Sequence, residues 1–227
     1  MAQVQRIGDR RTSVDIVFDA LYEEIVSLKL LPGDKLSEAD VASRFGVSRQ
    51  PVRDAFSRLE NLDLLLIRPQ KATEIKRFSF AAIEKSRFVR AAVESEVLRR
   101  AADACDEQGA ALLDASLSKQ QEAVEQNKHD TFGTLDYNFH KTLCAIAGVD
   151  FAFDVIASEK AKVDRLCVLS LSKERRMSQL LDDHVAIAQS VKDGDAEGAV
   201  EVGLVHLSRL DATIEAIRMK NENYFDP

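Results

Sequence analysis

The stretch LSEADVASRFGVSRQPVRDAFSRLE, residues 36–60, decides the fold of the first part of this chain. Its apolar residues recur at helical spacing on both sides of Gly46, where a glycine permits a tight turn between two short helices. Ser37 and Ser48 stand where helix N-caps are expected, and Pro51 falls in the first turn of the second helix, where its missing N–H does little harm. The stretch therefore predicts two short helices joined by a tight turn.

The sequence on either side completes a small domain. Residues 13–29 have the apolar periodicity of an amphipathic helix. Residues 64–67 and 73–76 read as two short strands around a tip at 68–72. Three helices followed by a hairpin, in this order, form a winged helix-turn-helix, and we place this domain at residues 1–77.

The remainder of the chain, residues 78–227, is predicted to be helical throughout. The helical patterns run over residues 80–103, 107–127, 130–147, 150–171, 177–192 and 195–219. Six helices over this length are enough to enclose a hydrophobic core of their own. The predicted fold class is therefore mainly α, with an N-terminal winged helix-turn-helix and a C-terminal all-helical bundle of about six helices.

Charge is distributed unevenly along the chain, whose net charge is −7. Residues 1–77 hold 13 Lys and Arg against 12 Asp and Glu, whereas residues 78–227 hold 18 against 26. Within 44–58 four arginines accompany one acid, and such a cationic strip can contact phosphates because salt screens distant charges. No apolar run approaches the roughly 18 residues of a membrane span. We expect a cytoplasmic protein without a membrane partner.

The second helix of the quoted stretch is the one expected to enter the major groove of double-stranded DNA, with its first residues at base edges. Arg44 and Arg58 are better placed for phosphates, and Lys71 at the wing tip acts through phosphates as well. The alternative is a surface helix whose arginines form intrahelical ion pairs, but only Asp54 is available within 44–58. The base-reading candidates are Ser48, Arg49, Gln50, Pro51 and Arg53.

A second constellation lies in the helical part. Asp136 and His140 are four residues apart and share a helix face, and His184 and His206 each lie within a later helix. A bundle can bring three such helices together, and one carboxylate oxygen with three imidazole nitrogens suits a divalent metal. Zinc is the first choice, with nickel or manganese open. Core histidines that bond to neighbouring side chains are the alternative on spacing alone.

The motifs of the first domain resemble those of the GntR family of bacterial regulators. The resemblance rests on Pro32-Gly33, Leu-Ser-Glu, Gly-Val-Ser-Arg-x-Pro-Val-Arg and Arg-Leu-Glu. The sequence departs from that family at Asp63 and at the wing tip, residues 70–72, where glycines are usual. Residues 80–220 resemble the FCD-type effector domain of the FadR subfamily, in which Asp-x-x-x-His and two later histidines hold a metal; all four positions match.

This resemblance implies a ligand-responsive transcription regulator, a repressor, that acts as a homodimer on a pseudo-palindromic operator. Its implied effector is a small organic or sugar acid, and Arg90, Glu94 and Arg165 are the candidate effector-binding residues. For Arg90 the alternative is an ion pair with Glu94 one turn later. The alternative function is a helical metal-dependent hydrolase or lyase fused to a DNA-binding domain. Because nothing specific marks a general acid or base, we do not expect an enzyme.

Overall fold

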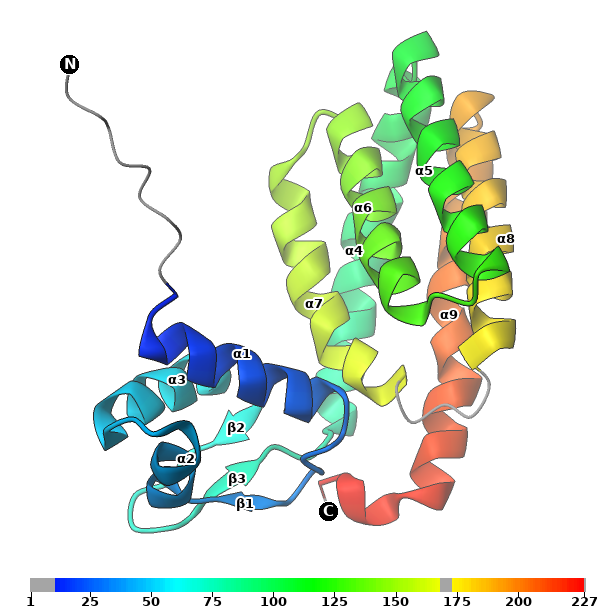
Figure 1. Cartoon of the computed structure of the whole chain (residues 1–227). Helices are drawn as coiled ribbons and strands as arrows, with labels where there is room; N and C mark the ends of the chain where they lie inside the picture. Colours follow the sequence, from blue (N-terminus) through cyan, green and yellow to red (C-terminus); the bar gives the residue numbers. More distant parts are fainter. Residues whose placement is uncertain (1–10, 168–172, 227) are drawn as a thin grey trace, which may run out of the picture. The chain divides into compact units, whose positions relative to one another are not determined.

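The computed structural model describes residues 11–167 and 173–226, and these form two compact units. The first unit holds three helices and three short strands, and the second holds a helical bundle (Figure 1). The mainly helical fold class predicted from the sequence is confirmed. The elements of the first unit are α1 (Ser13–Val26), β1 (Lys35–Leu36), α2 (Glu38–Phe45), α3 (Arg49–Asn61), β2 (Leu65–Leu66) and β3 (Thr73–Ile75).

The quoted stretch folds as predicted, into α2 and α3. Ser37 accepts a hydrogen bond from the backbone N–H of Asp40, so its hydroxyl caps α2. Gly46 ends α2 in the left-handed conformation, with φ of 64°, which is the turn that a glycine was expected to permit. Val52 and Leu59 of α3 are fully buried in the core of this unit, so the opposite side of α3 is left for solvent.

The wing contains one strand that the sequence analysis missed. The sheet has the order β1-β3-β2 with both pairings antiparallel, and Leu36 of β1 lies opposite Thr73 of β3. A two-residue strand is too short to show an alternating pattern, so it could be recognised only from its pairing. The predicted hairpin of β2 and β3 is present, with Leu65 opposite Ile75.

The two wing positions that depart from the family pattern keep a glycine-like backbone. Asp63 has φ of 62° and Gln70 has φ of 60°, although neither is a glycine. The left-handed conformation costs a residue with a Cβ about 1–2 kcal/mol. The chain therefore retains the bends before the first wing strand and at the tip, at a cost in stability.

We expect Gln70→Gly to stabilise the protein by about 0.5–1 kcal/mol. Glycine removes the left-handed penalty, and its larger entropy loss on folding offsets part of that gain. Gln70 is exposed, so the change removes no buried contact. Urea unfolding of Gln70→Gly and Gln70→Ala measures the effect, because alanine keeps the penalty. Equal stability of the two variants would show that backbone strain is absent at this position.

The second unit is a bundle built around α4. Helix α4 packs against α6, α7, α8 and α9, and α5 covers α6 and α8 on the other side (Figure 1). Leu98, Phe139 and Ile187, from three different helices, lie in the main core. Helix α8 begins before its predicted start at 177. The elements are α4 (Phe80–Ala104), α5 (Glu107–Glu125), α6 (His129–Ile146), α7 (Phe151–Cys167), α8 (Lys173–Lys192), α9 (Ala196–Lys220) and the 3-10 helix η1 (Glu222–Tyr224).

The end of the chain packs with the first unit. Residues 223–226, which the sequence analysis assigned to the second domain, lie beside Phe78. The Phe78 N–H donates to the carbonyl of Tyr224 and the Asp226 N–H donates to the carbonyl of Phe78, both at 2.8 Å. The rings of Phe78 and Phe225 are 5.5 Å apart, and both side chains are buried. The chain therefore joins the two units twice, after Phe78 and again before residue 223.

Candidate functional site

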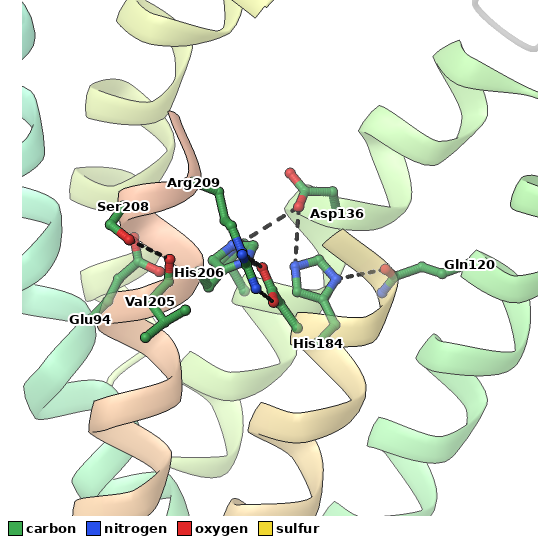
Figure 2. Close-up of polar contacts among 10 residues, drawn as sticks. Glu94, Gln120, Asp136, His184, Val205, His206, Ser208 and Arg209 are labelled. Atoms are coloured by element: carbon green, nitrogen blue, oxygen red, sulfur yellow. Dashed lines mark hydrogen bonds and ion pairs between the residues drawn. The ribbon is translucent and has the colours of Figure 1, made fainter. Parts of the chain in front are cut away.

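The predicted metal ligands converge inside the helical bundle. Asp136 and His140 come from α6, His184 from α8 and His206 from α9, and one ligand atom from each lies within 4.8 Å of the others. All four side chains are buried. Figure 2 shows Asp136, His184 and His206 directed toward a common point. The i, i+4 spacing on α6 placed the first two ligands, and the bundle supplied the other two.

The orientation of the imidazole rings fits a cation. Nε2 of His140 and Nε2 of His184 lie 3.9 and 3.3 Å from Oδ1 of Asp136. Both Nε2 atoms are buried without a hydrogen-bond partner, which is costly for polar atoms unless something binds them. Three nitrogens and one oxygen are a donor set that Zn²⁺ and neighbouring transition metals accept. The residues present therefore fit a divalent metal.

Side chains behind the histidines fix two of the rings. Oε2 of Glu94 lies 2.9 Å from Nδ1 of His140, and Oε1 of Gln120 lies 2.7 Å from Nδ1 of His184 (Figure 2 shows the Gln120 contact). An amide or carboxylate oxygen only accepts hydrogen bonds, so each Nδ1 carries a proton, and Nε2 is the ring nitrogen that faces Asp136.

The third histidine, His206, is contacted by a carboxylate at a longer distance. Oδ2 of Asp183 lies 3.5 Å from Nδ1 of His206, which is long for a hydrogen bond. Arg209 donates to both oxygens of Asp183, at 3.2 and 3.1 Å, and so holds that carboxylate in place near His206.

The electrostatics keep Asp136, His184 and His206 in their metal-binding protonation states. Burial lowers the pKa of His184 to about 4 and also lowers the pKa of His206, so both are neutral at pH 7. Burial alone raises the pKa of Asp136, but the Lys160 ammonium, 2.8 Å away, holds that pKa well below its usual value. Neutral imidazoles and an ionised carboxylate are the forms that bind metal without first losing a proton.

We expect Gln120→Leu to weaken metal binding by about 10–100-fold, the range typical of residues that orient a ligating histidine. Leucine cannot accept the Nδ1 proton of His184, so the ring loses its fixed orientation. Gln120→Glu keeps an acceptor and should bind at least as tightly as the wild type. Competition with a chromophoric chelator measures the affinities. The matched control is Gln121→Leu, at an exposed position on the same helix; equal affinity of all three variants would remove the orienting role.

The predicted DNA-binding residues lie on the first unit and have different surroundings. Ser48 caps no backbone N–H, and Arg49 is exposed at the start of α3. Within the described ranges no hydrogen-bond or ion-pair partner is found for Arg49. The Gln50 amide donates to Asp54 at 2.9 Å, and Pro51 is half-buried in the first turn of α3.

The other arginines of the cationic strip are paired with acids. Arg53 lies 2.8 Å from Glu38 of α2, and Arg44 forms a two-pronged pair with Glu24 of α1. Arg58 pairs with Asp15 of α1 at 2.9 Å, and its guanidinium lies 4.0 Å from the ring centre of Phe18. Arg44 and Arg58 thus tie α1 to α2 and α3. Lys71 is exposed at the wing tip. Phosphate contacts by these three residues stay a prediction.

Comparison with known proteins decides the family. The sequence profile of the bacterial regulatory proteins of the gntR family matches residues 14–75, and that of the FCD domain matches residues 87–209. Over 209 residues the chain is 35% identical to the HTH-type transcriptional repressor RspR of Escherichia coli (strain K12), an alignment that covers 92% of each protein. The chain belongs to the GntR family and carries an FCD domain.

A more distant relative of this GntR regulator is also named as a repressor, and two solved structures share its fold. The chain is 25% identical to the probable D-xylose utilization operon transcriptional repressor of Paenarthrobacter nicotinovorans, over 87% of this chain and 86% of that protein. The fold matches Escherichia coli McbR/YncC with a TM-score of 0.70 at 17% identity, over 91% and 98% of the two chains. It matches a putative GntR regulator from Rhodococcus sp. RHA1 with a TM-score of 0.71 at 20% identity, over 89% and 97%.

The family assignment settles the broad class of the protein. The relatives are regulators of transcription, so this GntR-family chain is a transcription regulator and not the metal-dependent hydrolase or lyase of the alternative reading. No helix in the described ranges is both long and apolar enough to cross a membrane.

Two of the predicted effector-binding residues of this GntR regulator lie beside the candidate metal ligands. Arg90 and Glu94 are buried on α4 and form the ion pair foreseen as the alternative, at 2.8 Å. Glu94 also holds His140, so its carboxylate has a structural task in addition to any contact with an effector. Arg165 falls in α7, but its side chain lies outside those that the structure describes.

Sequence reasoning missed the role of Gln120 and Lys160 in this GntR regulator. Gln120 carries a detectable signal: on α5 it continues, at helical spacing, an inward-facing stripe of the buried Leu113 and the partly buried Leu117, and Ala123 follows it. A polar residue in such a stripe indicates a buried polar contact. Lys160 stands in a polar stretch of α7, where nothing in the sequence distinguishes it from a solvated lysine.

Proposed function

We propose that this GntR regulator is a repressor whose affinity for its operator is set by a small carboxylate bound beside a divalent metal in the FCD domain. The metal, zinc first, is held by Asp136, His140, His184 and His206. Two relatives are named as repressors, RspR of Escherichia coli and the probable D-xylose utilization operon repressor of Paenarthrobacter nicotinovorans. Their names support repression rather than activation as the action of this protein.

The observation that carries the proposal is the balance of charge around the four ligands. Among the described residues, each buried carboxylate there is paired with a lysine or an arginine: Asp136 with Lys160, Glu94 with Arg90 and Asp183 with Arg209. The charges within these pairs cancel, and His184 and His206, whose pKa values are lowered by burial, add no charge at pH 7. A divalent cation would leave two positive charges uncompensated in a buried site, and an anionic ligand offsets such an excess.

The chain's own residues also favour a carboxylate over other anions. A cation on four protein ligands would supply Lewis-acid coordination to one oxygen of the ligand, because transition metals accept further ligands. Arg90 is a buried guanidinium that already pairs with the Glu94 carboxylate beside the ligands, and guanidinium groups bind carboxylates in a two-pronged geometry. The histidines keep their orientation through Glu94 and Gln120 while the ligand binds.

The partner of the other unit is double-stranded DNA. The exposed start of α3, at Ser48 to Arg53, supplies base contacts, and a homodimer presents two such helices to a pseudo-palindromic operator. Ligand binding releases the operator only if the ligand has different affinity for the DNA-binding and released arrangements.

The test is a titration of operator release. An operator fragment selected in vitro from random-sequence DNA is bound by zinc-loaded protein, and sugar acids, hydroxy acids, dicarboxylates and aromatic acids are added in turn. We expect one class of acid to raise the Kd for DNA by about 5–150-fold, the usual range of allosteric coupling. The neutral amide of the active acid serves as the control. An effect that persists after the metal is stripped, or no effect from any acid, contradicts the proposal.

A further inference from the structure

The two oxygens of the Asp136 carboxylate have different neighbours. Oδ1 lies 3.9 Å from Nε2 of His140 and 3.3 Å from Nε2 of His184, so it faces the other candidate ligands. Oδ2 lies 2.8 Å from the ammonium of Lys160 on α7. Figure 2 shows one oxygen of Asp136 directed toward the histidines and the other directed away from them. The carboxylate is therefore divided between the candidate metal site and the lysine.

Lys160 is held in this place by its surroundings. Its side chain is only 11% exposed, and its Nζ lies 4.4 Å from the ring centre of Tyr137, where a cation is attracted to the aromatic face. The adjacent Glu159 accepts a hydrogen bond at 2.6 Å from the hydroxyl of Ser86, which is fully buried on α4. This contact anchors α7 to α4 beside Lys160. The ammonium is thus fixed on the carboxylate, unlike that of a lysine on the protein surface.

The ammonium restricts what Asp136 can offer a metal. A carboxylate binds a metal through one oxygen or through both. An ammonium has three donors and a positive charge, so at 2.8 Å it occupies Oδ2 and repels a divalent ion from that side. We propose that Lys160 is a positioning residue that reserves Oδ2, so that Asp136 ligates the metal through Oδ1 alone and a coordination position stays open for the carboxylate of the effector. The inference rests on the proposed function for the metal and for the class of ligand.

A merely supporting role makes the opposite prediction. If Lys160 only orients Asp136, as Gln120 orients His184, its removal weakens metal binding. If Lys160 reserves Oδ2, its removal frees a second oxygen and takes a positive charge away from the ion, so metal binding becomes tighter. Loss of the lysine also leaves the buried Asp136 without this partner in the metal-free protein, which favours the metal-bound form further. The sign of the change in affinity therefore separates the two roles.

The first measurement is zinc affinity, by competition with a chromophoric chelator on full-length protein. We expect Lys160→Met to bind zinc at least about 10-fold more tightly than the wild type, because charges a few ångström apart repel strongly in a buried site. Lys160→Arg keeps the charge and the donors and should bind as the wild type does. Lys162→Met is the matched control, since it removes from α7 a lysine that is 31% exposed and pairs with Glu159. Circular dichroism checks the fold, and Lys160→Gln takes the place of Lys160→Met if that variant does not fold.

Two spectra test the coordination directly. In the infrared difference between zinc-loaded and metal-free protein, the asymmetric and symmetric carboxylate stretches lie further apart for coordination through one oxygen than through two. We expect the wider separation in the wild type and Lys160→Arg, and the narrower one in Lys160→Met. Acetate, as a probe carboxylate, is then titrated into protein loaded with Co²⁺. It should shift the visible spectrum of the wild type and leave that of Lys160→Met unchanged.

The possible failures point to different parts of the argument. Unchanged or weaker zinc binding by Lys160→Met, the same carboxylate separation as in the wild type, or an equal response of both proteins to acetate would overturn the inference and leave the proposed metal site standing. If acetate does not bind the cobalt of the wild type while the zinc and infrared results are as expected, the proposed carboxylate ligand is refuted and coordination through one oxygen of Asp136 stands. A wild type that binds neither metal refutes both.

Discussion

Replacing His184 or His206 with alanine is expected to lower the metal content of the purified protein from about one ion per chain to a small fraction of that. Each change removes one of four donors from a buried site, so the loss of affinity should exceed the roughly 10–100-fold that follows loss of an orienting residue. The remaining donors are the buried Asp136 and two imidazoles, which leave the ion with fewer protein ligands than a structural zinc site requires.

The measurement is elemental analysis of protein purified without chelator. A second readout is the thermal midpoint, because a metal that binds only the folded state stabilises it by about 2.7 kcal/mol at a concentration 100 times its Kd. Zinc should raise the midpoint of the wild type and leave that of the two variants unchanged. His129→Ala is the matched control, since His129 lies outside the cluster at the start of α6. Full metal occupancy in both His184→Ala and His206→Ala would refute the site.

The sequence predicted the parts of the protein that depend on local pattern. The turn at Gly46 and the shared face of Asp136 and His140 follow from spacing along a single segment, and the structure contains both. The convergence of His184 and His206 on that face depended on the packing of three helices, and a resemblance to known effector domains was needed to expect it.

The parts that sequence reasoning missed depend on distant pairing. Strand β1 exists because Lys35 and Leu36 find β3 across the wing, and Lys160 acquires its role from Asp136 on a different helix. Gln120 was recognisable in principle, since a buried stripe that admits a glutamine must provide it with a partner. No local pattern indicates that residues 223–226 pack beside Phe78.

Under the proposed function, the connectivity bears on how the candidate metal site is coupled to the first unit. Helix α4, which carries Arg90 and Glu94, follows directly after Phe78. Helix α9, which carries His206, leads through η1 into the segment that pairs with Phe78. Two of the helices that hold the centre are thus the two that continue into the first unit. Under the proposed function, a ligand that shifts α4 against α9 would act on both connections at once. Allosteric coupling of this kind needs an element with two arrangements whose equilibrium both sites bias.

Loss of specific DNA binding is the second large effect expected, from Arg49→Ala. Arg49 is exposed at the first position of α3, where a helix in the major groove presents its side chains to base edges. A two-pronged contact to guanine discriminates by about 1–3 kcal/mol, which corresponds to a loss of about 5–150-fold in affinity for the selected operator in each half-site. Affinity for unrelated DNA should fall much less, because it rests on phosphate contacts.

Arg53→Ala is expected to act in the same direction, although Arg53 must first exchange its ion pair with Glu38 for a base. Fluorescence anisotropy at fixed salt measures both variants on the selected operator and on a scrambled duplex. Arg100→Ala is the control, because Arg100 is exposed on α4 of the other unit and pairs there with Glu96. If Arg49→Ala keeps the ratio of specific to non-specific affinity, α3 does not read bases through Arg49, and the assignment of the recognition helix fails at the residue best placed to carry it.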